Sequence, residues 1–159
     1  MPNWAFNKVM LVGMKTDVEA SINGILNEGD VDFNKIIPMP AHQPDLLEPN
    51  PFWAEGDMPF VLNEIFGRNT WYDWSVANWG TKWNARDTSI SGNLVEFDTA
   101  WAGVSKVILE WSRKFPAVDM GYDVSYEAEN VVDHYVIRAG EEISYWEEEL
   151  EYEEYEEEE

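Results

Sequence analysis

Runs of apolar and aromatic residues alternate along the chain with segments whose apolar residues are spaced three and four apart. Together they predict a mixed fold of strands and helices. The aromatic and apolar run at 4–12 predicts a first strand, which ends at Gly13. The Thr-Asp-Val-Glu sequence that starts at Thr16 has the pattern of a capping box, and apolar residues at helical spacing then predict a helix as far as residue 26. A second strand is predicted over 33–37.

The middle of the chain is rich in proline and tryptophan. Most of the eight prolines lie between residues 38 and 59, a density that breaks regular structure. A short helix is predicted over 58–66, and a Trp-rich stretch follows at 71–83. We therefore expect an inserted Pro/Trp-rich segment at about 38–83.

The second half of the chain has the pattern of one helix among several strands. Apolar residues spaced three and four apart predict a helix that starts at Val104 and ends before Pro116. The expected strands lie at 93–99, 118–127 and 131–139, with a further edge strand at 141–146.

This order of elements predicts an α+β fold. Strand, helix, strand, insertion, strand, helix and strand is the order of a ferredoxin-like, or split βαβ, domain with an antiparallel sheet and two helices on one face. We expect this domain to span residues 1–140. Residues 141–159 are expected to form an acidic Glu/Tyr tail, first as an edge strand and then disordered.

Charge separates the tail from the rest of the chain. The chain has 32 acidic and 10 basic residues, a formal net charge of −22. Residues 141–159 contain 12 glutamates and neither Lys nor Arg. Such a balance excludes direct binding to a nucleic-acid backbone as the main activity, disfavours an anionic membrane surface and favours a basic protein partner. Extended at about 3.4 Å per residue, the tail carries one charge per roughly 5 Å, against about 3.4 Å along one strand of DNA.

Two interpretations of the tail remain open, a solubilising disordered end and a surface that imitates nucleic acid. The negative charge of the rest of the chain favours the second. The expected partner-binding residues are its glutamates and the aromatic residues among them: Glu141, Glu142, Glu147, Glu148, Glu149, Glu151, Glu153, Glu154, Tyr145, Trp146, Tyr152 and Tyr155.

The chain has no signature of catalysis. It lacks cysteine, which excludes disulfides and thiolate chemistry, and its two histidines, His42 and His134, have no partner at metal-ligand spacing. The calcium-loop pattern that begins at Asp30 fails because Lys35 and Ala41 replace the required Gly and Glu. We expect no enzyme activity, cofactor or metal. Since no apolar run is long enough for a membrane span and the start lacks a secretory pattern, we expect a protein of the host cytoplasm.

Five tryptophans allow two interpretations. Trp71, Trp74, Trp79, Trp83 and Trp101 could form a stacking platform for bases or part of the hydrophobic core. Stacking platforms lie beside basic grooves, and most charged neighbours here are acidic. A structural role is the favoured interpretation.

Several motifs together resemble a known family. These are the starting Met-Pro-Asn-Trp, the Asn-Trp-Gly-Thr-Lys-Trp segment at 78–83, the Phe-Asp-Thr-Ala-Trp segment at 97–101, and Phe115-Pro116 with Tyr122 and Tyr126. Over about 1–140 the chain resembles the YubB-like ferredoxin-like proteins of phages and plasmids. It departs from their pattern at Ala5, where Cys is usual, and at Ala102-Gly103, where Pro-Pro is common. The tail lies outside the resemblance.

The resemblance implies a ferredoxin-like fold and a mobile-element setting, and it supplies no catalytic residues. A small acidic protein in that setting is similar in kind to DNA mimics that inhibit host nucleases. We therefore expect a counter-defence protein, an anti-CRISPR or anti-restriction inhibitor that blocks the nucleic-acid-binding surface of an effector such as a CRISPR nuclease. The alternative is an accessory module that binds a basic protein unrelated to defence.

Overall fold

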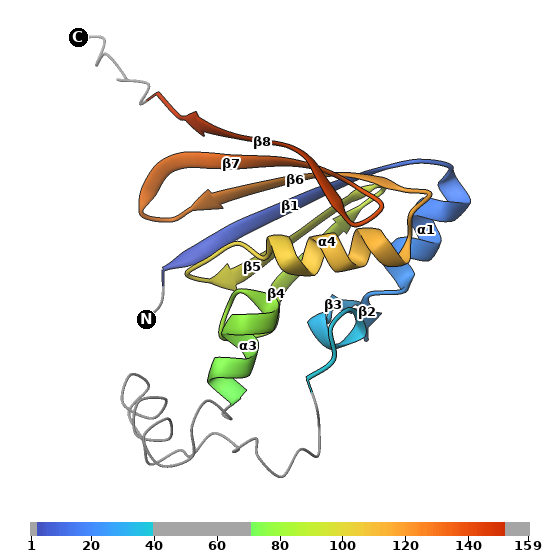
Figure 1. Ribbon diagram of the computed structural model, residues 1–159, viewed down its shortest axis with the longest axis horizontal. Helices are drawn as coiled ribbons and strands as arrows, with labels where there is room; N and C mark the ends of the chain where they lie inside the picture. The colour runs from blue at the N-terminus through green and yellow to red at the C-terminus, as the bar shows by residue number, and fades with distance from the viewer. Residues whose placement is uncertain (1–2, 40–70, 152–159) are drawn as a thin grey trace, which may run out of the picture.

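The computed structural model describes residues 3–39 and 71–151, so the helix expected at 58–66 lies outside the described residues. Six strands form one antiparallel sheet in the order β4-β5-β1-β6-β7-β8 (Figure 1). The strands of this sheet are β1 (Trp4–Val12), β4 (Arg86–Ser91), β5 (Leu94–Ala100), β6 (Asp119–Tyr126), β7 (Glu129–Arg138) and β8 (Glu141–Glu149). The other elements are α1 (Lys15–Asn23), the short hairpin β2 (Leu26–Asn27) and β3 (Asp30–Val31), the 3₁₀ helix η1 (Phe33–Lys35), α3 (Trp71–Trp79) and α4 (Ser105–Lys114).

The sheet has one covered and one open face. In the central strand β1, every second residue from Ala5 to Leu11 is buried beneath the helices, because successive side chains of a strand point to opposite faces. Phe6, Met10 and Val12 lie exposed on the other face. Helix α4 crosses the covered face (Figure 1), and its buried Trp111 anchors it.

The arrangement confirms the predicted α+β class with an antiparallel sheet. Strand β1 pairs with both β5 and β6, which places the first strand in the centre of a split βαβ unit. The strands β7 and β8 extend the sheet beyond β6. Three α-helices are present among the described residues where two were expected, because α3 forms within the Trp-rich stretch and packs against α4.

The predicted strand at 33–37 is wrong. Its first residues form the 3₁₀ helix η1, in which the Asp32 carboxylate accepts a hydrogen bond from the Asn34 N–H at 2.9 Å. Phe33 is fully buried, with its ring 5.6 Å from that of Trp79 and 5.7 Å from that of Phe97. Long-range packing therefore sets this segment's structure.

Within the six-stranded sheet, the strand missing from the prediction is β4. It pairs with β5 at the opposite edge of the sheet from β8, and a bulge interrupts the pairing after Arg86. Its sequence, Arg-Asp-Thr-Ser-Ile-Ser, is mostly polar, and its side chains are mostly exposed. A polar edge strand has no apolar alternation, so the pattern gave no signal for it.

Candidate functional site

The predicted partner-binding residues lie mainly on β8. This strand forms the edge of the sheet, pairs with β7, and has all nine residues exposed. It is three residues longer than the expected strand at 141–146. Seven of the predicted residues lie on it: Glu141, Glu142, Tyr145, Trp146, Glu147, Glu148 and Glu149. Glu151 follows the strand, whereas Tyr152, Glu153, Glu154 and Tyr155 lie outside the described residues.

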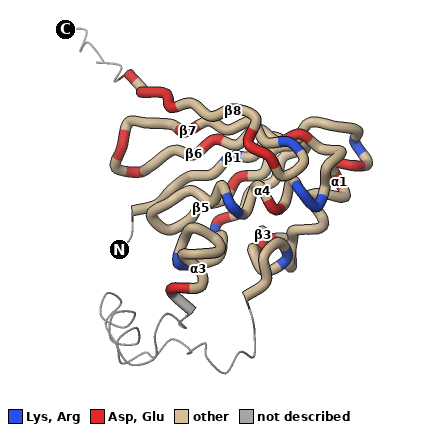
Figure 2. The backbone as a smooth tube through the Cα atoms, in the orientation of Figure 1, with Lys and Arg blue, Asp and Glu red and all other residues tan. Residues whose placement is uncertain are grey.

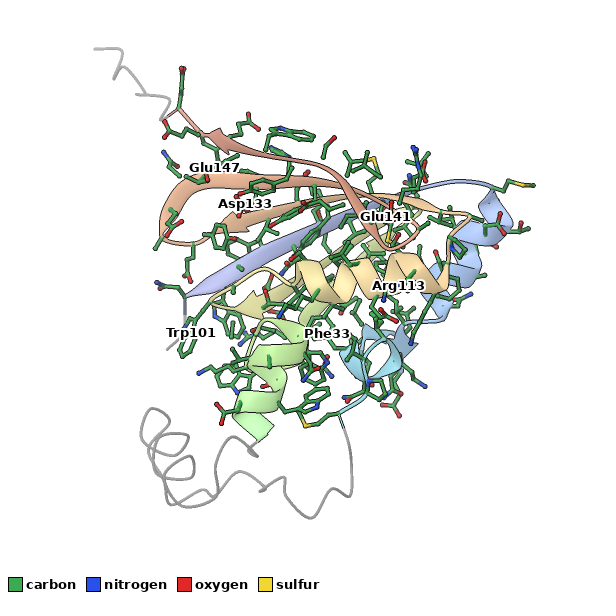
Figure 3. The ribbon with its side chains drawn as sticks, in the orientation of Figure 1. Phe33, Trp101, Arg113, Asp133, Glu141 and Glu147 are labelled. Atoms are coloured by element: carbon green, nitrogen blue, oxygen red, sulfur yellow. The ribbon has the colours of Figure 1, made fainter. Side chains whose placement is uncertain are left out.

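The register of β8 divides these residues between the two faces of the sheet. Tyr145 and Glu147 lie opposite Tyr135 and Asp133 of β7, on the face that the helices cover. Figure 3 shows Glu147 and Asp133 on these neighbouring strands. Trp146 and its neighbour Glu148 lie on the open face. Strand β8 therefore presents carboxylates on both faces of the sheet.

On the helix-covered side, one carboxylate joins three strands. Asp133 accepts hydrogen bonds from the Tyr145 hydroxyl at 2.9 Å and from the Tyr126 hydroxyl at 2.7 Å. The bond to Asp133 raises the pKa of Tyr145 to about 12. Burial, and then the same carboxylate, raises the pKa of Tyr126 as well. Both tyrosines therefore remain neutral donors that hold β6 and β8 against β7.

On the open face, His134 lies between two carboxylates. Its Nδ1 is 2.6 Å from Asp123 on β6, and its Nε2 is 2.7 Å from Glu148 on β8. The imidazole also stacks on Trp146, with ring centroids 5.1 Å apart and planes 20° from parallel. Burial lowers the pKa of His134, but the two carboxylates raise it more, so the pKa lies above its usual value of 6.5.

Only the doubly protonated imidazole can donate to both carboxylates at once. Protonated His134 therefore ties β6 to β8 across β7. These partners of His134 could not be recognised from the sequence, because Asp123 and Glu148 lie 11 and 14 residues away along the chain. The strand register brings the three together.

Negative charge gathers on the last three strands and the turns between them. Residues 119–151 contain eleven acidic residues and one basic residue, Arg138. The guanidinium of Arg138 is already engaged, since it donates to both oxygens of Asp119 at 3.0 and 3.1 Å. Figure 2 shows acidic residues at both ends of β8 and at the β6–β7 turn. This part of the molecule presents carboxylates with little internal neutralisation.

A second cluster combines tryptophans with cations. The Lys82 ammonium lies 4.0 Å from the ring centroids of both Trp83 and Trp101, and the Arg86 guanidinium lies 4.2 Å from that of Trp4. Trp4 and Trp83 have ring centroids 6.2 Å apart. Two cations therefore lie over tryptophan rings within one cluster. The cluster could not be recognised from the sequence, because its residues come from three separate segments, at residue 4, residues 82–86 and residue 101.

The tryptophans differ in burial. Trp79 is 4% exposed and donates its indole N–H to the Ile37 carbonyl at 2.8 Å, as expected of a core residue. Trp74 is partly buried against it, with ring centroids 5.3 Å apart. Trp101 is 51% exposed, lies at the end of the sheet near the start of β1 (Figure 3), and has a φ of +67°. This exposure places Trp101 outside the core, and the side chain of Trp71 lies outside the described residues.

A buried polar network supports the loop that carries Trp101. The Asn7 amide donates to Thr99 Oγ1 at 2.9 Å, and its oxygen accepts from the Tyr122 hydroxyl. The same hydroxyl accepts from the Val104 N–H at 2.8 Å. The loop between β5 and α4 is thereby attached to β1 and β6.

The described residues contain neither a membrane-spanning helix nor a metal-binding cluster. No helix there has the length and apolar character needed to cross a bilayer. Over the same part of the chain, no three His, Asp or Glu side chains are grouped so that they could hold a metal ion.

The second half of the chain identifies the family to which the protein belongs. Residues 78–159 match the family described as the ferredoxin-like domain in Api92-like protein. The chain belongs to this family. The match includes β8 and reaches residue 159, whereas the resemblance in the sequence was expected to end near residue 140.

A solved structure has the same fold. The crystal structure of protein api92 from Yersinia pseudotuberculosis is similar with a TM-score of 0.61, covering 95% of this chain and 99% of that chain. The two sequences are 8% identical, so this likeness concerns the fold alone. No curated protein matches the chain.

Proposed function

We propose that this protein is a counter-defence inhibitor of phage or plasmid origin that occupies the nucleic-acid-binding surface of a host nuclease. Its acidic edge strand β8 (Glu141–Glu149) would make the contact, and the target would be a basic effector such as a CRISPR nuclease. The observation that carries this proposal is the row of exposed carboxylates along β8, with no Lys or Arg on the strand.

The charge spacing of β8 suits this role. Three consecutive glutamates, Glu147 to Glu149, lie in an extended strand. Because successive side chains point to opposite faces, Glu147 and Glu149 share one face and lie roughly 6.8 Å apart, about the distance between every second phosphate along one strand of duplex DNA. A groove lined with Lys and Arg would attract such a row over distances up to a Debye length of about 8–10 Å.

The contacts within the sheet also support the proposal. Bonds to Asp133 and His134 hold Tyr145 and Glu148 in place, so β8 presents its charges from a fixed strand. A fixed array loses less conformational entropy on binding than a flexible acidic tail would lose. The mobile-element setting comes from the resemblance to YubB-like proteins, and the defence role is an inference from that setting and the charge.

The direct experiment measures displacement of nucleic acid. A purified CRISPR nuclease loaded with labelled target DNA is titrated with the full chain, and bound DNA is followed by fluorescence anisotropy. We expect the chain to displace DNA, with a potency that falls as salt rises from 50 to 300 mM. Excess unlabelled DNA should restore nuclease activity.

Two matched variants locate the contact. Glu147, Glu149 and Glu151 are replaced together by Gln, which leaves the Glu148 bond to His134 intact. The control replaces Glu19, Glu28 and Asp30, three exposed acids on α1 and the β2–β3 hairpin, outside the six-stranded sheet, by the corresponding amides. We expect the first variant to lose potency about tenfold, mainly through a slower association rate, and the control to lose little.

Three results would count against the proposal. An equal loss of potency in both variants would mean that the net charge of the protein, and not the position of the carboxylates on β8, causes the displacement of DNA. Potency that does not change with salt would exclude a carboxylate-driven contact. A complex in which the nuclease holds the chain and its DNA together would favour the alternative, an accessory module that engages a basic protein without displacing nucleic acid.

A further inference from the structure

Strand β8 leaves one edge of its backbone open. It is the last strand of the sheet, and in the part of the chain that the structure describes only β7 pairs with it (Figure 1). An edge strand presents a row of unpaired N–H and C=O groups, onto which another extended chain can be added. Nine exposed residues make this edge long enough for several main-chain bonds.

The register identifies the groups that point outward. The Leu150 N–H donates to the Asn130 carbonyl at 2.8 Å, and the pairing continues without a shift as far as Val136 opposite Ser144. Along an antiparallel strand, residues alternate between those that bond to the neighbour and those that do not. The main-chain groups that point away from β7 are therefore those of Tyr145, Glu147 and Glu149.

The same stretch is held firmly on its inner side. The Tyr145 hydroxyl bonds to Asp133, and Trp146 and Glu148 both contact His134. The Asn130 amide donates to the Leu150 carbonyl at 3.0 Å, which secures the end of the strand. An incoming segment would therefore meet an edge that is already straight and fixed, which lowers the entropy cost of pairing.

Charge selects what can pair with this edge. Five of the nine residues of β8 are glutamates, and none is basic. A second copy of β8 would place Glu against Glu, and like charges on directly opposite residues destabilise a strand pair. A strand with Lys or Arg at alternate positions would place opposite charges there.

From these observations we infer that β8 accepts an extended, Lys- or Arg-bearing segment of a partner protein as a seventh strand of the sheet. The inference rests on the proposed function in requiring a basic partner. It adds that the partner is bound through main-chain hydrogen bonds as well as through charge. Glu147 and Glu149, whose main chains point outward, would then meet basic side chains directly across the new strand pair.

The test uses the full chain and two synthetic peptides of ten residues with alternating Lys and Val. In the second peptide the central residues are N-methylated, which removes main-chain donors from both edges and keeps the charge. We expect the methylated peptide to bind at least tenfold more weakly by isothermal calorimetry. In hydrogen exchange followed by NMR, the unmethylated peptide should slow the Tyr145, Glu147 and Glu149 amides at least tenfold and change the Trp146 and Glu148 amides little.

Particular results would overturn the inference. Equal binding of both peptides would show that charge alone acts, a result that leaves the displacement experiment on the nuclease unaffected. Protection at β4, or at no strand, would place the contact elsewhere. Dimerisation of the chain that the peptide reverses would show that the edge pairs with a second copy. The Glu147→Gln, Glu149→Gln double variant should weaken peptide binding, whereas Glu19→Gln with Glu28→Gln should not.

Discussion

Protonation of His134 should contribute to stability in a way that depends on pH. The ring has both nitrogens within 2.7 Å of a carboxylate and is 17% exposed. Hydrogen bonds to charged groups contribute about 1.5–3 kcal/mol when shielded from water, whereas exposed ion pairs contribute about 0.2–1 kcal/mol. Asp123 and Glu148 are 44% and 56% exposed, so we expect about 1 kcal/mol from the two contacts together.

The sign follows from the raised pKa of His134. A group whose pKa is higher in the folded than in the unfolded state contributes its full stabilisation at pH values below its unfolded pKa, which is near 6.5 for His134. That contribution is lost as the pH rises through the pKa of the folded state. Above that pH the neutral ring can donate to one carboxylate and turns a lone pair toward the other. The contribution should therefore be present at pH 6 and absent by pH 9.

The assay is urea unfolding followed by tryptophan fluorescence, for the wild type and His134→Gln, at several pH values. The free energy of unfolding should differ by about 1 kcal/mol at pH 6, and the difference should shrink toward zero at pH 9. His42→Gln, which removes the other histidine, serves as the control. A difference that stays constant from pH 6 to 9, or grows with pH, would refute the doubly bonded imidazolium.

Three substitutions and two truncations have defined outcomes in thermal or urea unfolding. Trp79→Ala should cost about 3–5 kcal/mol because it empties a buried site. Trp101→Gly should change stability by less than about 1 kcal/mol, because relief of the left-handed backbone offsets the lost contact with the Lys82 ammonium; a loss above about 3 kcal/mol would contradict this. Tyr122→Phe should cost about 1–3 kcal/mol by leaving buried partners unbonded. Ending the chain after Leu150 should leave the melting temperature unchanged. Ending it after Gly140 removes eight paired positions and should lower the free energy of unfolding by about 2–4 kcal/mol. Equal stability of the two truncated chains would mean that β8 contributes nothing to the stability of the domain.

This last expectation differs from the domain boundary that the sequence suggested. The run of glutamates from Glu147 indicated a tail that follows a complete domain at 1–140. In the structure, Tyr145 packs against Tyr135, with ring centroids 4.9 Å apart, and Tyr135 in turn stacks on the buried Tyr122. Because charge dominates the composition there, the apolar and aromatic contacts that β8 makes with the sheet were not visible from composition.

Local spacing alone determined several elements of this protein. The strand at 4–12 is marked by a run of aromatic and apolar residues, and the helix that follows Val104 is marked by apolar residues spaced three and four apart. The uneven distribution of acid was also evident from the sequence. These properties depend on residues close together in the chain, so no knowledge of the packing was needed.

Features that depend on contacts between residues far apart in the chain were decided only by the tertiary structure. Phe33 became part of a 3₁₀ helix because its ring packs against Trp79 and Phe97, and the polar β4 became a strand because β5 pairs with it. The position of His134 between two carboxylates follows from the register of three strands. A shift of one residue in that register would turn each of these side chains to the opposite face, and local spacing carries no information on which strands are neighbours.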